Sequence, residues 1–293
     1  MRNDPEIGTA TPTSQDLVPE DLAIGPVALN VASAERVGSF YKQALGLEGM
    51  VSDDGHVLLG SGGVPLLELR ESPGAPSRPP GSTGLFHLAI LEPDRAALAS
   101  RTRGLLEAGV AIDGASDHLV SEAIYLRDPE GNGIEIYRDR PRSDWDWSGG
   151  EVAMATLPLD VASLLAEPGP EEAGRPLTLG HVHMNVADLQ ESVAFYTQVL
   201  GLDLTTGSYP GAAFVSAGGY HHHFGLNTWN GVGAPAPPAG ALGLAGVTAT
   251  ITGDGQLAGT AARAHEAGRE VGEIPGGIAV TDPSGVALRL LEG

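Results

Sequence analysis

The sequence predicts an α+β protein built from four β-α-β-β-β units, arranged in two halves and paired into cup-shaped mixed sheets. The prediction comes from a long internal repeat, a second and weaker repeat, and short apolar segments separated by glycine-rich turns. The chain has 293 residues, which is room for about two domains of roughly 150 residues each. Its 42 glycines and 22 prolines stay below the share of roughly a quarter to a third that marks disorder.

The strongest repeat aligns residues 25–47 with residues 180–202 without a gap, at a constant offset of 155. Many of these positions carry the same amino acid in both copies. In the first copy they are Gly25, Val27, Asn30, Val31, Ala32, Phe40, Tyr41, Gln43, Leu45, Gly46 and Leu47. Identity at this density indicates that a structural unit has been duplicated.

A weaker repeat divides each half again. Residues 84–90 match residues 243–249 at an offset of 159. The turn sequence Asp128-Pro-Glu-Gly131 matches Asp282-Pro-Ser-Gly285 at an offset of 154. The chain therefore holds four units of about 50 residues each.

Two segments are expected to lie outside the two halves, a disordered tail at 1–21 and a linker at 141–176. The first half is then expected at 22–140 and the second at 177–293. The linker contains Trp145 and Trp147. They could form a surface for a partner, but aromatic side chains commonly dock a linker onto its own domain, and we expect docking.

Each unit is expected to open with a strand and to continue with an amphipathic helix. The opening strands are Val27–Val31, Leu85–Leu91, Val182–Val186 and Leu244–Ile251. The first helix has apolar side chains at helical spacing, namely Val37, Phe40, Tyr41 and Leu45. Ser33 is expected to cap its start and Gly46 to end it, and Asp188 should cap the matching helix of the third unit.

Short strands separated by glycine-rich turns complete each unit. They are expected at Val57–Leu59, Pro65–Leu69, Ile124–Leu126, Gly133–Tyr137, Ala213–Val215, His221–Leu226, Ile278–Val280 and Val286–Leu291. A single unit would leave one face of its sheet uncovered, so we expect the units to pair.

The charge and the composition of the chain exclude several classes of function. With 16 basic and 37 acidic residues the formal charge is −21, which repels nucleic acids and anionic membrane surfaces. Cysteine is absent, so disulfides, thiolate ligands and a cysteine nucleophile are excluded. No apolar run reaches the roughly 18 residues of a membrane span, and the N-terminal sequence has no signal-peptide pattern. We expect a cytoplasmic protein that acts on a small molecule.

The repeated pattern resembles the vicinal oxygen chelate superfamily, which includes glyoxalases, extradiol dioxygenases and bleomycin-resistance proteins. The resemblance is carried by residues 33–47, by their copy at 188–202 and by residues 128–137. It covers residues 24–292 apart from the linkers, and it implies the paired, cup-shaped sheets. Dimers are common in this superfamily, so a homodimer is a further expectation.

Two further stretches resemble the catechol 2,3-dioxygenase-like two-domain proteins of this superfamily. They are residues 114–126, which lead toward Glu135, and residues 218–229. In the first stretch, His118 and Tyr125 resemble the acid/base and hydrogen-bonding pair of extradiol enzymes. A surface histidine and a core tyrosine are the simpler interpretation of these two residues.

The second unit offers one pair of metal ligands. The resemblance implies one ligand on the first strand of a unit and another on its last strand. His87 alternates with Phe86 and Leu88, and Glu135 lies between two isoleucines, so strand alternation lets both point into a cup. Alone, His87 could be a hydrogen-bonded core histidine and Glu135 could lie on a solvated face. Together they favour a metal site.

The third unit offers a second set of histidines. His181 and His183 share one face of their strand. If residues 221–226 form a strand, His221 and His223 share a face and His222 takes the other. The histidine run could also be a solvated loop. We expect at least one of His181, His183, His221 and His223 to be a ligand.

The missing ligands indicate which units share the site. The first unit has Pro26 and Ala28 where the third has histidines, and the fourth has Gly246 and Arg289 where the second has His87 and Glu135. In the first unit, Glu68 is the one residue that could replace a missing ligand. Neither half completes a site alone, whereas the second and third units together do, and some glyoxalase-type members pair their units in this crossed fashion. We therefore expect one metal site shared between the halves.

The expected cofactor is a divalent metal. Two histidines and one carboxylate suit Fe(II) or Mn(II), and a third histidine favours Zn(II), Ni(II) or Co(II). The resemblance implies an Fe(II)-dependent extradiol dioxygenase that acts on a catechol-like vicinal diol. Two alternatives stay open: a metal-dependent lyase or isomerase that works through an enediolate, and a metal-free protein that binds a drug or natural product.

Overall fold

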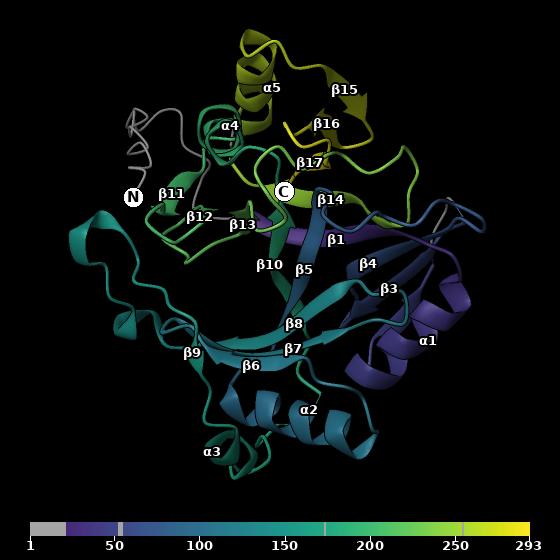
Figure 1. Cartoon of the computed structure of the whole chain (residues 1–293), viewed down its shortest axis with the longest axis vertical. Coiled ribbons are helices and arrows are strands. Elements are labelled where there is room, and N and C mark those ends of the chain that lie inside the picture. The colour runs from purple at the N-terminus through teal and green to yellow at the C-terminus, as the bar shows by residue number, and fades with distance from the viewer. Residues whose placement is uncertain (1–21, 52–54, 173, 254) are drawn as a thin grey trace.

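The computed structural model describes residues 22–51, 55–172, 174–253 and 255–293, and its strands form curved sheets with helices on their outer faces (Figure 1). Each of the four units has one helix after its first strand and three strands after the helix. The α+β class and the β-α-β-β-β units are thus confirmed. The tail expected at residues 1–21 lies outside the described residues.

The second and third units together form one eight-stranded sheet, which we call the site sheet. Its order is β6-β7-β8-β5-β10-β13-β12-β11. The strands are β5 (Gly84–Leu91), β6 (Gly114–Asp117), β7 (Ser121–Arg127), β8 (Gly133–Asp139), β10 (Thr178–Asn185), β11 (Asp203–Thr206), β12 (Ala212–Ser216) and β13 (Phe224–Asn227). Within each unit the first and last strands are parallel, whereas the two units meet through antiparallel β5 and β10.

The first and fourth units form a second sheet of the same design, the companion sheet. Its order is β2-β3-β4-β1-β14-β17-β16-β15. The strands are β1 (Leu22–Val31), β2 (Glu48–Met50), β3 (Val57–Ser61), β4 (Val64–Glu71), β14 (Gly243–Ile251), β15 (Val271–Ile274), β16 (Gly277–Thr281) and β17 (Ala287–Glu292). Antiparallel β1 and β14 join the two units.

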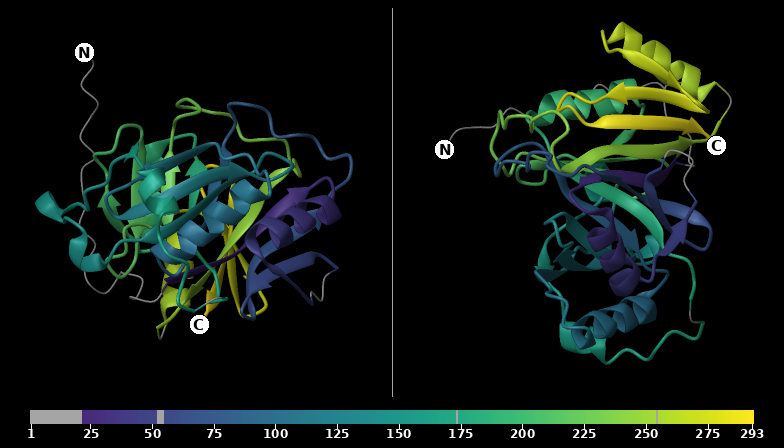
Figure 2. Two further views of the ribbon diagram at one scale, coloured as in Figure 1. Left: turned by 90° about the horizontal axis from the view of Figure 1, so that it is seen from below. Right: turned by 90° about the vertical axis from the view of Figure 1, so that its right-hand side faces the viewer.

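The crossed pairing of units expected from the sequence is therefore confirmed. Each sheet takes one unit from each half of the chain, and the two sheets touch where Ile24 of β1 pairs with Leu179 of β10. Figure 2 shows the fourth unit and α5 at one end of the molecule and α2 at the other. A site on the site sheet is consequently built by residues far apart in the chain.

The helices are α1 (Ala34–Leu45), α2 (Arg95–Glu107), α3 (Val161–Leu165), α4 (Leu189–Ala194), which continues as a π-helical turn at Phe195–Val199, and α5 (Gln256–Glu266). The predicted limits of two helices are confirmed, namely both ends of α1 and the start of α4. The Ser33 hydroxyl accepts a hydrogen bond from the Arg36 amide, and Asp188 accepts one from the Glu191 amide. Gly46 ends α1 with a φ of 71°, a conformation that glycine adopts without strain. No helix of the described residues is long and apolar enough to cross a membrane.

The linker between the halves packs along the site sheet. Its short strand β9 (Leu157–Pro158) pairs with β6, and α3 contacts α2. Trp145 is buried against Val120, Val152 and Tyr220, whereas Trp147 is 41% exposed. The docking expected of the tryptophans is thus made by Trp145.

Strands β2, β6, β11 and β15 were not located individually from the sequence. They have three or four residues each and include positions that are not buried. So short a segment gives almost no alternation to detect.

Candidate metal centre

Three side chains from three adjacent strands converge on the concave face of the site sheet. His87 lies on β5, Glu135 on β8 and His181 on β10. Ala89 of β5 is in register with Glu135 on one side and with His181 on the other. Ala89 thus places a small, fully buried side chain between the three larger ones. The opposite face of these strands belongs to the hydrophobic core, where Leu88, Ile90, Ile134 and Ile136 are packed.

The donor atoms of this group are close together. His87 Nε2 lies 2.9 Å from Glu135 Oε2, and His181 Nε2 lies 3.4 Å from the same oxygen. One donor atom from each residue lies within 4.8 Å of the other two. All three residues are at most 5% exposed. Among the residues that the structure describes, this is the group of three with the spacing of metal ligands.

Apart from the close approach to Glu135, the imidazole nitrogens have few partners. His87 Nε2 and both ring nitrogens of His181 are buried, and within the described residues none makes a hydrogen bond of acceptable geometry. A buried polar atom without a partner costs about 1–3 kcal/mol. A divalent cation coordinated by the two nitrogens and the carboxylate would remove that cost, so the donor set fits a metal ion.

The protonation states also suit a cation. Burial lowers the pKa of His181 to about 4, although the charge of Glu135 opposes this shift. Burial alone would raise the pKa of Glu135, but its interactions with His181 and His87 outweigh burial and hold that pKa well below the usual range. A neutral imidazole beside an ionised carboxylate is the state that binds a metal.

His183 lies beside this group without belonging to it. It pairs directly across the strands with His87, and the two rings are 5.0 Å apart. Its ring packs over Gly225, where a Cβ atom would lie 2.8 Å from the ring. Its Nε2 atom is buried without a hydrogen-bond partner, and burial lowers its pKa well below the usual value.

His221 and His223 contact residues outside the group of three donors. His221 Nε2 lies 2.8 Å from Asp139 Oδ1, and His223 Nδ1 lies 2.9 Å from Ser216 Oγ. The expected strand at residues 221–226 begins only at Phe224. Strand alternation therefore does not govern the three histidines, and the prediction that His221 and His223 share one face of a strand is wrong, because residues 221–223 precede that strand.

His222 is the member of the run that faces the pocket, and alternation alone had missed it. Its ring centroid lies 4.1 Å from that of His181. Its Nδ1 atom lies 2.7 Å from His221 Nδ1, so His222, His221 and Asp139 form a hydrogen-bonded chain. Burial, above all, lowers the pKa of His222 well below its usual value. The run of three consecutive histidines was the sequence feature that could have identified His222 as a pocket residue.

Phe86 also departs from the alternation of its strand. His183 pairs with His87 and Met184 pairs with Leu85, which leaves Phe86 as an extra residue in a β-bulge. The bulge turns Phe86 toward the site, where its ring lies 5.1 Å from that of His183.

His118 and Tyr125 form a hydrogen-bonded pair next to the donors. His118 Nε2 lies 2.6 Å from the Tyr125 hydroxyl, and His118 Nδ1 lies 2.7 Å from the Ala155 carbonyl. Because a carbonyl only accepts, Nδ1 carries the proton in the neutral ring and Nε2 accepts from Tyr125. Tyr125 is in register with Glu135, and burial, helped by the charge of Glu135, raises its pKa well above the usual value.

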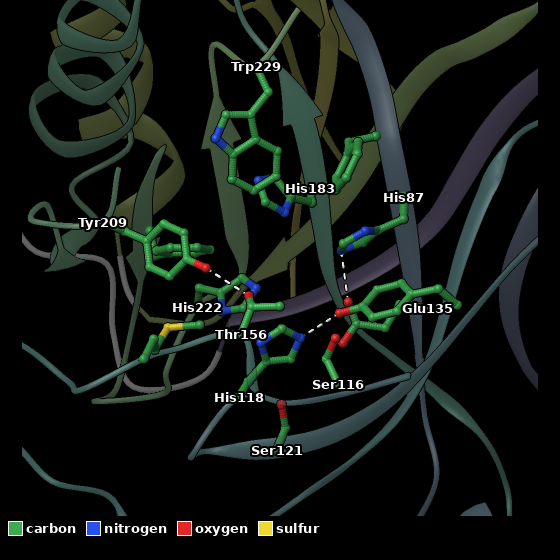
Figure 3. A pocket seen from close by; sticks show the side chains of 14 residues that line it. His87, Ser116, His118, Ser121, Glu135, Thr156, His183, Tyr209, His222 and Trp229 are labelled. Atoms are coloured by element: carbon green, nitrogen blue, oxygen red, sulfur yellow. Dashed lines mark hydrogen bonds and ion pairs between the residues drawn. The ribbon is translucent and has the colours of Figure 1, made fainter. Parts of the chain in front are cut away.

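The donor group opens into a pocket of about 260 Å³. Figure 3 shows His87 and Glu135 at one side, Tyr209 at the opposite side, His118 below and Trp229 above. The fourteen lining residues come from the second unit, the third unit and the linker. They are Phe86, His87, Ser116, His118, Ser121, Tyr125, Glu135, Met154, Thr156, His183, Tyr209, Phe214, His222 and Trp229.

The companion sheet carries an ion-pair cluster at the corresponding place. Glu68 of β4 is 5% exposed. Arg70 Nε lies 2.6 Å from Glu68 Oε1, and Arg289 of β17 approaches Glu68 Oε2 at 3.5 Å. His56 Nδ1 lies 3.0 Å from Glu68 Oε1. Cationic side chains thus neutralise the one carboxylate that had been considered a stand-in ligand.

Paired β-α-β-β-β units with a buried His/Glu group on their concave face define a class of metal-binding enzymes and binding proteins. The chain belongs to the Glyoxalase/Bleomycin resistance protein/Dioxygenase superfamily, whose family model matches residues 23–136 and 178–290. The resemblance seen in the sequence is thereby confirmed.

Similar proteins cover almost the whole chain. The catechol-2,3-dioxygenase of Bacillus subtilis strain 168 is 44% identical over 272 residues, which are 90% of this chain and 95% of that protein. A crystal structure from the same organism, provisionally described as a dioxygenase, has a TM-score of 0.66 at 15% identity and covers 92% of this chain and 84% of that one. Glyoxalase I from Zea mays has a TM-score of 0.58 at 17% identity, covering 93% and 92%. At such identities the two solved structures show the fold alone.

Proposed function

We propose that this protein is an extradiol-type ring-cleaving dioxygenase that acts on a small aromatic vicinal diol. The observation that carries the proposal is the buried group of His87, Glu135 and His181, whose donor atoms lie close together and of which His87 and Glu135 line the pocket. Its 44% identity to a catechol-2,3-dioxygenase supports the choice of reaction.

His87, Glu135 and His181 would hold the metal ion. Two imidazoles and one carboxylate with open positions are the ligand set of many non-heme Fe(II) oxygenases, so Fe(II) is the proposed metal, and Mn(II), Zn(II) and Ni(II) are the alternatives. When bound, the ion would supply a coordination site for both hydroxyls of the diol and lower their pKa.

His222 is proposed to accept a proton from the diol. Its ring lines the pocket beside His181, and its lowered pKa keeps the imidazole neutral near pH 7. A neutral imidazole can take up a proton from a hydroxyl group within reach.

His118 and Tyr125 are proposed to orient the bound diol. The Tyr125 hydroxyl donates a hydrogen bond to His118 Nε2, so the lone pairs of its oxygen stay free to accept another hydrogen bond. The high pKa of Tyr125 keeps this hydroxyl protonated. The pair therefore presents one fixed acceptor near Glu135.

Oxygen consumption tests the proposal. Protein purified without a histidine tag is stripped of metal, loaded anaerobically with Fe(II), and mixed with catechol and air-saturated buffer. We expect one O₂ consumed per catechol ring opened, in the loaded protein alone. Metal binding without oxygen consumption would favour the lyase or isomerase alternative, and absence of stoichiometric metal binding would favour the metal-free binding protein.

A further inference from the structure

Building on the proposed function, we propose that the pocket selects uncharged vicinal diols with an apolar substituent and rejects diols that carry a carboxylate. Three properties of the pocket support this selectivity: the positions of its polar groups, the charges of its lining residues and its volume.

The pocket has a side that carries the candidate ligands and a side that carries aromatic rings. His87 and Glu135 lie together on one side (Figure 3), and Tyr125 is in register with Glu135. On the other side, Tyr209 packs 5.7 Å from Phe214 and 6.5 Å from Trp229, measured between ring centroids. A diol whose hydroxyls face Glu135 therefore directs the rest of its ring toward aromatic side chains.

A row of ring contacts links the two sides. The ring centroid of His183 lies 5.0 Å from that of His87 and 5.3 Å from that of Trp229. Trp229 is 47% exposed, although its indole Nε1 donates to the Pro210 carbonyl. An exposed indole fixed in position at a pocket wall offers a flat apolar surface to a ligand.

The charge of the lining disfavours an anion. Among the lining residues of the described chain, Glu135 is the acidic one and neither lysine nor arginine is present. Recognition of a carboxylate normally uses an arginine or lysine, because such an ion pair offsets the desolvation of the anion. The nearest site cation would be the metal, whose positions the two hydroxyls of the diol would take. A second negative charge on the ligand would then lie unpaired against the aromatic wall.

The volume leaves room for a substituent. The pocket measures about 260 Å³, whereas a dry cavity of roughly 150 Å³ is enough to hold benzene. The remaining space fits a few further carbon atoms. Thr156 and Tyr209 bound this space through a hydrogen bond of 2.7 Å between their hydroxyls.

The test compares catechol, 4-ethylcatechol and 3,4-dihydroxybenzoate on the Fe(II)-loaded protein, by oxygen uptake and by anaerobic titration of tryptophan fluorescence. We expect kcat/KM and affinity to be at least about 100-fold lower for the carboxylate than for either neutral diol. The Trp229→Phe variant assigns the fluorescence change to the pocket. Rates and affinities within threefold of one another would overturn the proposal.

A positive charge introduced among the lining residues of the pocket provides a second test. Thr156 is exposed and lines the pocket, so Thr156→Arg adds a cation, and Thr156→Met adds a side chain of similar length without charge. We expect Thr156→Arg to improve use of 3,4-dihydroxybenzoate at least tenfold relative to Thr156→Met, and an equal effect of both variants would contradict the proposal. If no diol supports oxygen uptake, the proposed reaction fails, and the fluorescence titration still decides whether the pocket prefers neutral diols. If no diol binds either, both proposals fail.

Discussion

His87 and His181 come from different halves of the chain, yet their Nε2 atoms approach the same carboxylate oxygen, Glu135 Oε2, at 2.9 and 3.4 Å. This convergence exists because β5 and β10 are antiparallel neighbours in a sheet that takes one unit from each half. The companion sheet has the same design, but its Glu68 is held by arginines. Among the described residues, the candidate metal site is therefore confined to the site sheet.

The first prediction concerns metal content. His87→Ala and His181→Ala should each reduce bound metal from about one ion per chain to below a tenth, because each removes one of three ligands. Elemental analysis of tag-free protein measures this. His265→Ala is the matched control, because His265 lies exposed on α5. If one of the two site variants keeps its metal, the site is not shared between the halves.

The second prediction concerns the space between the ligands. Ala89 is in register with both Glu135 and His181 and is fully buried. Ala89→Val would place two methyl groups there, and we expect metal affinity to fall at least tenfold although all three ligands remain. Overpacking of this kind costs about 1–3 kcal/mol of stability, so thermal unfolding is measured beside metal titration. Unchanged affinity would show that the ion does not lie over Ala89.

The third prediction concerns the chain of Asp139, His221 and His222. A carboxylate accepts from His221 Nε2, so in a neutral His221 the Nδ1 atom is an acceptor and His222 Nδ1 carries the shared proton. This leaves His222 Nε2 unprotonated. Nitrogen-15 NMR should show that tautomer in the parent protein and a mixture of tautomers in Asp139→Asn. We expect the variant to lose at least tenfold in kcat with a smaller change in KM. A protonated Nε2 in the parent protein would contradict this assignment.

The fourth prediction concerns acid stability. Burial lowers the pKa of His223 to about 3. A buried neutral histidine stabilises the fold above its unfolded pKa of about 6.5, and this contribution is lost as the pH falls toward 3. Between pH 7 and 4.5 the metal-free protein should therefore lose about 2–3 kcal/mol more than its His223→Asn variant. Urea unfolding at the two pH values measures the difference. Equal losses would mean that the pKa of His223 is the same in the folded and the unfolded protein.

The site residues that lie on regular strands could be predicted from sequence. His87, Glu135 and His181 are found by alternation because their neighbours Leu88, Ile134 and Val182 are buried on the other face. The pairing of the second unit with the third could also be predicted from the sequence, because each half lacks ligands that the other supplies.

The rest depended on irregular backbone. Phe86 reaches the pocket through a bulge that shifts the pairing with β10, and His222 reaches it because β13 starts only at Phe224. The alternation of side chains predicts their orientation only where the hydrogen-bonded strand is continuous, and it predicts nothing where the strand is interrupted. Met154 and Thr156 line the pocket because the linker folds over it, and no local pattern of residues specifies that contact.

The last prediction concerns how the units hold one another. Glu130 follows the Asp-Pro turn of the second unit, and its carboxylate accepts from the Ala32 amide at 2.7 Å, from the Ser33 amide at 3.1 Å and from Arg36 at 2.8 Å. These donors lie at the start of α1 in the first unit. In the fourth unit, Ser284 occupies the equivalent place and accepts from the Ala187 amide before α4.

Because a capping acceptor at a helix start contributes about 0.5–2 kcal/mol, Glu130→Ala should destabilise the protein by about 1–2 kcal/mol. The pKa of Glu130 is lowered, since its hydrogen bonds to Arg36 and to the backbone outweigh burial. The lowered pKa means that this contribution is present at neutral pH and lost in acid. The difference from Glu266→Ala, an exposed control on α5, should therefore shrink when urea unfolding is repeated near pH 3.5. A difference that persists unchanged there would assign the effect to packing instead of to the ionised carboxylate.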